Sequence, residues 1–464
     1  MNYEETLVYL YNLERFGIKL DLSNITTILN RLGNPHLKFP SIHIAGTNGK
    51  GSVAAMLHSI LCESGYRAGL YTSPHLVDFR ERIRVGSAGS SFESKLDKFE
   101  QELIEKDFVF DFVQGLKDEI DRQGFTFFEV TTAMAFAYFA CQKVDVAIVE
   151  TGLGGRLDAT NMINPLISVI TNISLEHTKH LGDAIPQIAS EKAGIIKDGI
   201  PTITAVSQPE ALDVIRSVCA EKNSELIHVQ DGSSYTVLDF SIQGSEFNFF
   251  SNSCKHENLE LRLAGEHQVL NAATCLTVIQ KLRQLGWRVE EPAIRVGLKK
   301  VNWRARLEVF KREPLVLLDV AHNPAGTKAL IETLDQFFSE RRIIFVFGVM
   351  EDKDYRSMLK EISRKAKFMV LTKPDYKRSA EPEMLKEALS SCVRNSSPDA
   401  LKGVRTKVLT QHEALIQANI PFEIVPQVKQ AYLFALKKAT VDDIICITGS
   451  HLTVGEFLNS FQSH

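Results

Sequence analysis

A glycine-rich turn near the N-terminus carries the residues best suited to holding phosphate. The stretch HIAGTNGKGSVAAMLHSIL, residues 43–61, has the pattern of a strand end, a turn and an amphipathic helix. Lys50 could place its charge on the β- and γ-phosphates of a nucleotide, and Ser52 could bind Mg²⁺ at the start of the helix, where the helix dipole favours an anion. The spacing departs from the usual P-loop, because only two residues separate Gly46 from Gly49. A strand–turn–helix without a ligand is the alternative.

Two further polar clusters follow stretches that we expect to be strands. DVAIVE, residues 145–150, would place Glu150 at the carboxyl end of a buried strand, where open α/β sheets bind ligands. A carboxylate there is a natural ligand of Mg²⁺, which prefers oxygen. Glu176 and His177 follow the stretch at 166–173. His177 could be a second metal ligand or a polar cap, and the spacing alone favours neither.

Two other segments carry charges that need an explanation. In TSPHLVDFRERIRVG, residues 72–86, Ser73 could reach a metal and the Arg/Glu cluster could form a lid, although a solvated loop fits the charge pattern equally well. Lys192 lies in the apolar helical pattern SEKAGIIK, where a buried lysine is costly unless it is paired or modified. From the residues alone, we expect a surface lysine whose amine reaches solvent.

The elements that position these residues alternate along the chain. Strand-like stretches at 41–45, 67–71, 145–150, 166–173 and 202–205 are separated by helical patterns at 52–64, 128–143, 185–196 and 209–222. This alternation predicts a mostly parallel sheet with helices on both faces. Residues 226–263 alternate like antiparallel hairpin strands, and a helix is expected at 267–285.

A second α/β series begins after Trp303. Its expected strands lie at 307–320, 341–349, 367–373 and 442–450, and its helices include 323–338 and 427–439. We therefore expect two domains, residues 1–301 and 302–464, which fits a chain of 464 residues. The polar stretch 391–407 is expected to be an exposed loop or insertion.

Composition excludes several classes of protein. The formal net charge of -4 argues against a general nucleic-acid binder, and no apolar run is long enough to span a bilayer. Seven cysteines are scattered without a CxxC pair, which is typical of reduced thiols in a cytoplasmic protein. The acidic N-terminal stretch lacks the basic region of a signal peptide.

Taken together, the motifs resemble one family. GTNGKGS, TSPHL…ERIRV, FFEVTTAMAF, ETGLGGRLDATN, ITNISLEHT, SEKAGI, HQVLNAA, LLDVAHNP and ITGS occur in this order. The set, which covers residues 40–456, is similar to folylpolyglutamate synthase and bifunctional dihydrofolate synthase, the folate branch of the Mur-type ligases. The resemblance implies a P-loop ATPase-like N-terminal domain with a small antiparallel section, and a smaller Rossmann-like C-terminal domain. It also makes GTNGKGS the family's own form of phosphate loop.

The resemblance assigns roles to individual residues, with ATP and Mg²⁺ as cofactors. ATP would be bound by Thr47, Asn48, Gly49, Lys50, Gly51, Ser52, Asn271, Arg306 and Asp319. Magnesium would be bound by Ser52, Ser73, Glu150 and His177. The catalytic group would comprise Lys50, Lys192 and His322, with Lys192 carbamylated. The pterin would be bound by Leu20, Asp21, Leu22, Thr126, Leu157, Asp158 and Ala159. The family often has W-P-G-R where this chain has Trp303-Arg304-Ala305-Arg306, and this difference affects the hinge and the choice of Arg306 over Arg304.

The implied reaction joins L-glutamate to a pterin-bearing carboxylic acid. The carboxylate attacks the γ-phosphate of ATP, and the amine of glutamate then displaces phosphate from the acyl phosphate. Dihydropteroate, folates or both remain open as substrates. A GTPase switch lacks its NKxD motif here, and a cell-wall Mur ligase needs a further N-terminal domain, whereas only 45 residues precede Gly46. A non-catalytic nucleotide-binding module is the third alternative. We expect a cytoplasmic monomer with small-molecule partners only, without nucleic acid or membrane.

Overall fold

The computed structural model describes residues 1–17, 19–87, 100–252, 254–394 and 420–461. These residues form two compact units. Unit 1 comprises Met1–Asp239, Ser245–Arg262 and His267–Trp303, and unit 2 comprises Phe240–Gly244, Leu263–Glu266 and Arg304–His464. The main crossing from one unit to the other thus falls between Trp303 and Arg304.

Unit 1 is built on a seven-stranded sheet of order β3-β2-β4-β1-β5-β6-β7. All neighbouring pairs are parallel except β2 with β3. The strands are β1 (Ser41–Ala45), β2 (Ala68–Tyr71), β3 (Ile83–Gly86), β4 (Val146–Glu150), β5 (Ile167–Ile170), β6 (Thr202–Thr204) and β7 (Leu226–His228). Every residue of β1 and β4 is buried, as expected for parallel strands that are covered on both faces.

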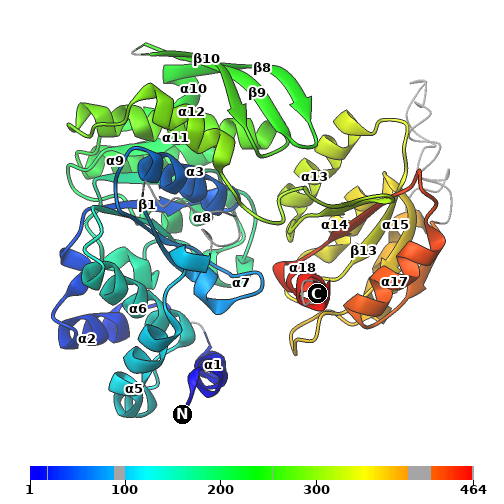
Figure 1. Ribbon diagram of the computed structural model, residues 1–464, viewed down its shortest axis with the longest axis horizontal. Helices are drawn as coiled ribbons and strands as arrows, with labels where there is room; N and C mark the ends of the chain where they lie inside the picture. The colour runs from blue at the N-terminus through cyan, green and yellow to red at the C-terminus, as the bar shows by residue number, and fades with distance from the viewer. Residues whose placement is uncertain (18, 88–99, 253, 395–419, 462–464) are drawn as a thin grey trace. The chain divides into compact units, whose positions relative to one another are not determined.

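Helices cover both faces of this sheet, as the sequence predicts. Figure 1 shows α3 on one side of β1 and α6 on the other. α3 packs on β1, β2 and β4 and also contacts α12. α6 packs on β2 and is itself contacted by α2 and α5. The longer helices are α1 (Tyr3–Asn12), α2 (Ser23–Arg31), α3 (Lys50–Glu63), α5 (Lys106–Gln123), α6 (Phe127–Cys141), α8 (Ile185–Ala193), α9 (Pro209–Glu221), α11 (Glu266–Gln284) and α12 (Glu291–Lys300). The short ones are η1 (Leu13–Phe16), η2 (Pro35–Leu37), η3 (Phe79–Arg82), η4 (Ala159–Met162), α7 (Thr178–Leu181) and α10 (Val229–Gly232).

The predicted antiparallel section is confirmed. It is a three-stranded sheet of order β10-β9-β8, with β8 (Ser233–Ser241), β9 (Gly244–Ser251) and β10 (Lys255–Leu261). Burial alternates along β9, with Phe247 and Phe249 fully buried, because successive side chains of a strand point to opposite faces. The turn between β9 and β10 lies close to the end of α11 through contacts of Gln280.

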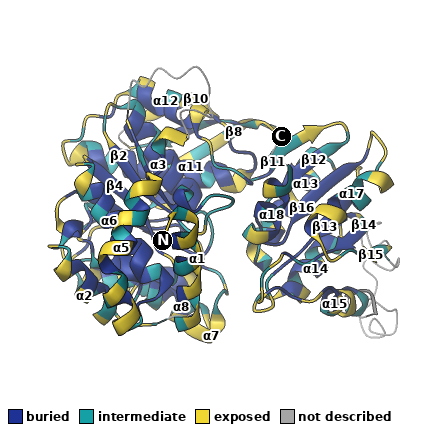
Figure 2. Ribbon diagram, turned by 60° about the horizontal axis from the view of Figure 1, so that its bottom comes forward, coloured by how far each residue is buried: buried dark blue, intermediate teal, exposed yellow. Residues whose placement is uncertain are grey.

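Unit 2 is a second α/β sheet, of order β11-β12-β16-β13-β14-β15. Its strands are β11 (Glu308–Arg312), β12 (Leu315–Leu318), β13 (Ile343–Phe347), β14 (Ala366–Leu371), β15 (Phe422–Ile424) and β16 (Ile444–Thr448). Its helices are α13 (Pro324–Phe337), α14 (Tyr355–Ser363), α15 (Pro382–Arg394), α17 (Val428–Lys438) and α18 (His451–Phe461). β13 and β16 are entirely buried, whereas the outer faces of the helices are exposed (Figure 2). The two-unit α/β architecture confirms the predicted fold class.

The expectation for residues 391–407 is wrong for the first four of these residues. The stretch 391–407 was expected to be an exposed loop, yet residues 391–394 form the last turn of α15. Its apolar spacing, with Leu385 and Leu389 buried against the sheet, continues the helix to this point. The remainder of the stretch, 395–407, lies outside the described residues.

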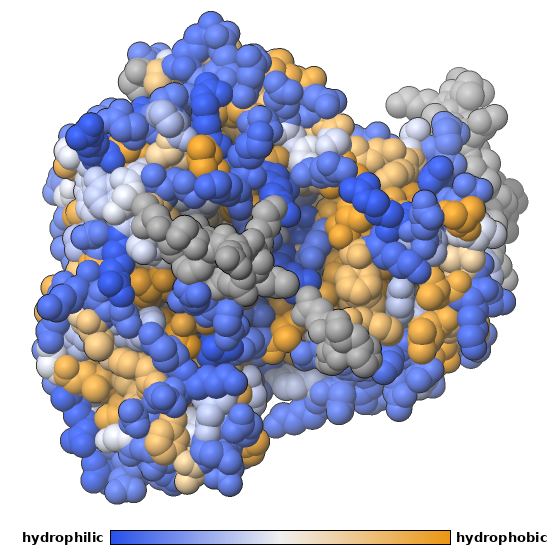
Figure 3. All heavy atoms as spheres, in the orientation of Figure 1, coloured by the Kyte–Doolittle hydropathy of each residue, from blue (hydrophilic) through white to orange (hydrophobic). Residues whose placement is uncertain are grey.

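The surface gives one further observation on class. No helix in the described part of the chain is both long and apolar enough to cross a membrane. On the face drawn in Figure 3, hydrophilic side chains predominate and hydrophobic ones are scattered among them.

Candidate active site

The glycine-rich turn connects the end of β1 to the start of α3, and its glycines are required by close neighbours. Gly46 has a φ of 151°, and a Cβ there would lie 1.9 Å from Oγ1 of Thr171. Gly49 has a φ of 84°, and a Cβ would lie 2.5 Å from Oδ1 of Asn271. Neither position tolerates another residue without movement of the loop. The second contact also places Asn271, a predicted ATP-binding residue on α11, directly beside the loop.

The loop that follows β5 fixes the shape of this turn. The amide of Thr47 donates to the carbonyl of Asn172 at 2.9 Å, and the amide of Asn48 donates to Oδ1 of Asn172 at 2.8 Å. In return, Thr171 donates through Oγ1 to the carbonyl of Asn48 at 2.6 Å. Two amides of the turn are therefore already used within the protein. The amides of the first turn of α3 remain for an anion, because no helix supplies intrahelical acceptors for them.

Three strand ends bring charged and polar groups to one place. Nζ of Lys50 donates to the carbonyls of Gly46 and Thr47 at 3.0 and 3.2 Å and lies 3.8 Å from Oε1 of Glu150. The amide of Ser73, beyond β2, donates to Oε2 of the same carboxylate at 3.2 Å. The ends of β1, β2 and β4 thus converge as the parallel order predicts. Ser52, two residues after Lys50 on the first turn of α3, is buried.

Lys192 is buried beneath the turn. Its side chain on α8 donates to the carbonyl of Gly46 at 2.8 Å, and the residue is only 4% exposed. Burial, and secondarily the charge of Lys50, lower the pKa of Lys192 to about 7. The expectation of a surface lysine is therefore wrong, because the apolar pattern of α8 turns this position towards the core. A substantial fraction of the amine is neutral at pH 7.

This burial predicts how stability depends on pH. The folded-state pKa of about 7 lies below the ordinary value of 10.5, so between these values the unfolded chain holds more protons and stability rises with pH. We expect Lys192→Met to remove up to ~1.4 kcal/mol per pH unit of this rise, and to stabilise the protein most near pH 7. Urea unfolding at pH 7, 8 and 9 in bicarbonate-free buffer measures the slope. Lys300→Met, at an exposed position, serves as the control, and equal slopes in wild type and Lys192→Met would contradict the prediction.

His177 lies in the same loop region after β5. It precedes α7 with a left-handed φ of 51°, and its Nε2 lies 3.8 Å from Oε1 of Glu176. It is the N-cap residue of α7, but its side chain makes no capping hydrogen bond to that helix. Among the described residues, no group of three or more His, Cys, Asp or Glu side chains could hold a metal. The predicted magnesium ligands would instead have to combine Glu150 and His177 with serine oxygens.

The three segments predicted to bind the pterin pack together near the start of α6. α2 contacts both α6 and η4, and α6 contacts η4. Asn24 on α2 donates through Nδ2 to Oε2 of Glu129 at 3.0 Å, and Glu129 forms the capping box of α6 with Thr126. Leu20 is exposed, whereas Ala159 is buried. Leu22 and Leu157 are partly exposed, and Asp21 accepts hydrogen bonds from Ser23 at the start of α2.

Asp158 organises the loop before η4. Its carboxylate accepts from the amide of Leu153 at 2.7 Å and from the amide and the hydroxyl of Thr160 at 3.0 and 2.5 Å. Burial nevertheless raises the pKa of this carboxyl, because the hydrogen bonds offset desolvation only in part. The hydroxyl of Thr160 lies 2.8 Å from Nε2 of the fully buried His43. Hydrogen bonds to Asp158 and with His43 on β1 therefore hold the predicted pterin-binding loop in place.

Arg82 is a residue that sequence reasoning missed. It was grouped into a charged loop or lid, yet it is 7% exposed, and its guanidinium lies over the ring of Phe127 at 5.0 Å. Nε donates to Nδ1 of His75 at 2.8 Å. No carboxylate among the described residues makes an ion pair with it, whereas neighbouring Arg80 pairs with Asp78 and Glu100. Burial lowers the pKa of Arg82, as expected for a cation that lacks a close anion. The arginine pattern in the sequence carries no signal that distinguishes these two positions.

The remaining predicted residues lie in unit 2. Asp319 follows β12 and accepts hydrogen bonds from the amides of Leu307 and Ala321 at 2.9 and 2.8 Å. Burial raises the pKa of Asp319, and the charge of Arg306 partly offsets this rise. His322 shares the turn, and its ring lies 5.1 Å from that of His451. These residues therefore form one cluster at the carboxyl end of β12.

Ala305 shows the consequence of the WRAR sequence. It occupies the left-handed region with a φ of 55°, where the family often has glycine. We expect Ala305→Gly to raise the free energy of unfolding by about 1 kcal/mol, because a left-handed residue with a Cβ costs ~1–2 kcal/mol and the more flexible unfolded chain returns part of it. Urea denaturation measures the change. Ala329→Gly, inside α13, should lower stability by about as much, and a loss of stability in both variants would contradict the prediction.

Comparisons with known proteins give the class first and then the family. The model of the Mur ligase middle domain matches residues 100–279, and that of the Mur ligase, glutamate ligase domain matches residues 305–451. The chain is 36% identical over 425 residues to dihydrofolate synthase/folylpolyglutamate synthase of Bacillus subtilis, covering 90% of this chain and 97% of the relative. The chain therefore belongs to the dihydrofolate synthase/folylpolyglutamate synthase family of Mur-type ligases.

Solved structures agree with this assignment. Folylpolyglutamate synthase of Mycobacterium tuberculosis, complexed with ADP and AMPPCP, matches with a TM-score of 0.82 and 30% identity, covering 100% of both chains. Escherichia coli FolC in complex with DHPP and ADP matches with a TM-score of 0.81 and 30% identity, covering 99% of this chain and 98% of that one. Both relatives were therefore solved with a nucleotide bound.

Proposed function

We propose that the chain is an ATP-dependent ligase that adds L-glutamate to a pterin-bearing carboxylic acid, either dihydropteroate, folates or both. The observation that carries this function is the meeting of Lys50, Glu150 and Lys192 around a turn whose helix begins with available amides. Relatives named for this activity, over nearly the whole length, support it. The relatives reported above are named for dihydrofolate and folylpolyglutamate synthesis, which favours this function over that of a Mur-type cell-wall ligase.

ATP is bound, in this proposal, by residues 47–52 together with Asn271, Arg306 and Asp319. The first-turn amides of α3 receive the phosphates, and Lys50 turns from the carbonyls of Gly46 and Thr47 towards them. Glu150, Ser52, Ser73 and His177 would hold Mg²⁺, since a buried carboxylate with neighbouring hydroxyls supplies the oxygen ligands that this ion prefers. When bound, the ion neutralises charge on the phosphates during transfer.

Lys192 is carbamylated in this proposal. Carbamylation needs a neutral amine to attack CO₂, and the lowered pKa of about 7 supplies one. The product is an anion. It replaces a buried cation that lies 2.8 Å from the carbonyl of Gly46, and it would form a favourable charge pair with Lys50. Lys192→Ala should lose activity and regain part of it with added acetate, whereas Lys197→Ala, in the loop that follows α8, should not respond to acetate. Wild-type turnover in unsupplemented Lys192→Ala would exclude the modification.

Arg82 receives the carboxylate of the pterin substrate in this proposal. A buried guanidinium without an acidic partner is costly, and a substrate anion would supply the missing charge. Its position over Phe127, next to Thr126 at the start of α6, is consistent with a site beside the pterin. The carboxylate would then be held in line with the γ-phosphate, which would lower the entropic part of the barrier to acyl phosphate formation.

A paired substitution tests Arg82. Arg82→Met keeps the alkyl packing and removes the buried cation, so we expect unchanged or higher stability and a KM for the pterin substrate raised about tenfold or more. Arg80→Met breaks ion pairs to Asp78 and Glu100 and should instead lower stability while that KM is kept. Steady-state kinetics and urea unfolding of both variants separate the two roles. An unchanged pterin KM in Arg82→Met would count against the proposed binding of the substrate carboxylate by Arg82.

The overall activity has a direct test. Incubation with ATP, Mg²⁺, L-glutamate and either dihydropteroate or tetrahydrofolate should release ADP and phosphate only when glutamate is present. The two pterins measured side by side also decide which substrate is used. Failure of both would remove the proposed function. We further infer a cytoplasmic monomer. Its location is in keeping with the free thiols of the six cysteines whose side chains the structure describes.

A further inference from the structure

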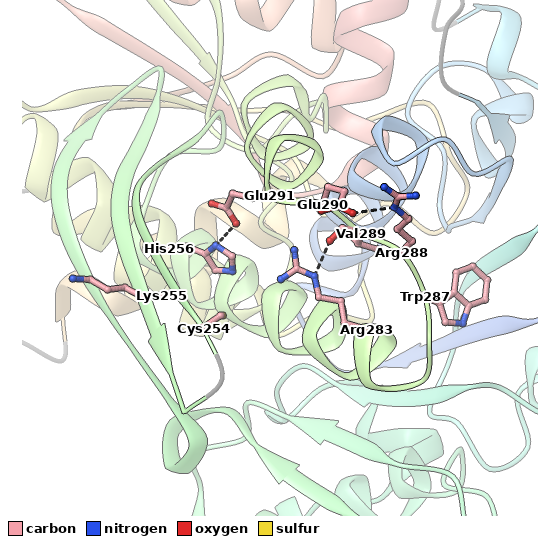
Figure 4. A pocket seen from close by; sticks show the side chains of 9 residues that line it. All are labelled: Cys254, Lys255, His256, Arg283, Trp287, Arg288, Val289, Glu290 and Glu291. Carbon is pink, nitrogen blue, oxygen red and sulfur yellow. Dashed lines mark hydrogen bonds and ion pairs between the residues drawn. The ribbon is translucent and has the colours of Figure 1, made fainter.

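An open cavity of about 680 Å³ lies in unit 1 at the turn between β9 and β10, away from the residues discussed above. The end of α11 and the start of α12 form its other walls. Figure 4 shows the side chains that line it. They are Cys254, Lys255, His256, Arg283, Trp287, Arg288, Val289, Glu290 and Glu291. A cysteine, a histidine and two carboxylates therefore share one cavity with three cationic side chains.

Cys254 is held by side-chain donors. Nε2 of Gln280 donates to its Sγ at 2.6 Å, and Oγ of Ser251 lies 3.5 Å from the same sulfur. Partial burial opposes ionisation of the thiol, but hydrogen bonds from His256, Ser251 and Gln280 outweigh burial and hold the pKa of Cys254 below its ordinary value. Donors of this kind stabilise a thiolate.

His256 lines the same cavity as Cys254 and is paired with a carboxylate. The residue is 3% exposed, and its Nδ1 lies 2.5 Å from Oε2 of Glu291. Burial disfavours the imidazolium, but the hydrogen bond to Cys254 and the charges of Cys254 and Glu291 raise the pKa of His256 above its ordinary value. Figure 4 shows the imidazole with one nitrogen directed to Glu291. A thiol that shares a cavity with an imidazole–carboxylate pair has the groups that activate a nucleophile.

Among the other described cysteines, Cys62 also lies beside a histidine, with its Sγ 3.7 Å from Nε2 of His58, but it is not in this cavity. Cys62, Cys219, Cys275 and Cys446 are buried, and Cys141 is exposed. Closure of the β9–β10 turn needs only the backbone of Cys254, whose carbonyl accepts from the amide of Ser251 at 2.9 Å. A structural role in the turn therefore leaves the thiol, His256 and Glu291 unexplained.

We propose that Cys254 is a modification site that exchanges with small anionic disulfides. Sγ of Cys254, as the thiolate, attacks one sulfur of the disulfide RSSR, and the new S–S bond forms as the old one breaks. The departing RS⁻ takes the proton of the His256 imidazolium, so that Cys254–S–SR, RSH and a neutral imidazole result. Three cations, Lys255, Arg283 and Arg288, line the cavity against two carboxylates, of which Glu290 pairs with Arg288, and this excess of positive charge favours an anionic R group.

The test uses the full-length protein with glutathione disulfide as the anionic probe and cystamine as the cationic one. Intact-mass spectrometry should find one rapid mixed disulfide with glutathione in wild type and in Cys141→Ser, and none in Cys254→Ser. Cystamine should react more slowly than glutathione disulfide, and Arg288→Gln should reduce this difference. Glu291→Gln should slow the glutathione reaction about tenfold, as a shift of one pKa unit predicts for the thiolate fraction.

The controls test three parts of the proposal separately, namely the site, the role of His256 and the preference for anions. Rapid labelling that persists in Cys254→Ser, or that disappears only in Cys141→Ser, would overturn the site. An unchanged rate in Glu291→Gln would overturn the relay through His256, and equal rates with both disulfides would overturn the preference for anions. Unmodified Cys254→Ser should keep the basal ligase activity, which makes the result independent of whether the proposed function holds.

Discussion

Lys50→Ala should lower turnover by about 10²–10³-fold while the fold stays intact. The transferred phosphoryl group develops charge that a positioned cation stabilises, and one such contact is worth roughly 3–4 kcal/mol. Nζ of Lys50 is only 3.8 Å from Glu150 and reaches the carbonyls of the turn, so it already lies within the space that the phosphates would enter. The substitution should act on the rate of phosphoryl transfer far more than on stability.

Pre-steady-state phosphate release and ADP formation measure this effect, and circular dichroism with urea unfolding checks the fold. Lys300→Ala is the matched control, because this lysine lies on α12 in an exposed ion pair with Glu63. It should leave turnover unchanged. A turnover of Lys50→Ala within about tenfold of wild type would mean that the lysine does not contact the phosphates.

The sequence predicted most of unit 1 because its signals are local. β1 was expected at 41–45 and is found there, since apolar runs bounded by glycine or proline suit buried parallel strands. The helices before Gly46 and α5 were not predicted, because their apolar stripes are narrow and are completed only by packing on α6. Tertiary contacts decide such elements.

In the candidate site too, the sequence predicts some features and only the fold reveals others. Gly46 and Gly49 follow from the motif, and the structure supplies the reason in Thr171 and Asn271, which no spacing rule connects to them. Lys192 and Arg82 show the limit of reasoning from residue type. Each is a cation that solvent normally surrounds, and only the fold shows that both are buried. The roles of individual site residues stay predictions.

Arg306→Ala should lower turnover about 10²-fold or more, whereas Arg304→Ala should change it little. The two arginines differ in their surroundings within unit 2. Nη2 of Arg304 lies 3.1 Å from Oε1 of Glu308, whose other oxygen accepts from the amide of Ala305 at 2.8 Å. This pair braces the WRAR turn, which is a structural task. Nη1 of Arg306 contacts the backbone carbonyl of Ala305 at 3.3 Å, and its charge acts on Asp319.

The expected loss in Arg306→Ala follows from this difference. Asp319 and Arg306 are both predicted to bind ATP, and a guanidinium close to a carboxylate that is fixed by two backbone amides is held ready for a phosphate. ATP kinetics should therefore change in Arg306→Ala while pterin affinity, measured by fluorescence titration, is kept. Arg304→Ala should lose stability through Glu308 but retain ATP turnover. If Arg304→Ala instead abolishes turnover, the nucleotide-binding arginine of the WRAR sequence is Arg304. If neither variant loses turnover, this turn does not serve ATP, because an arginine that neutralises a transferred phosphoryl group cannot be removed without a large loss of rate.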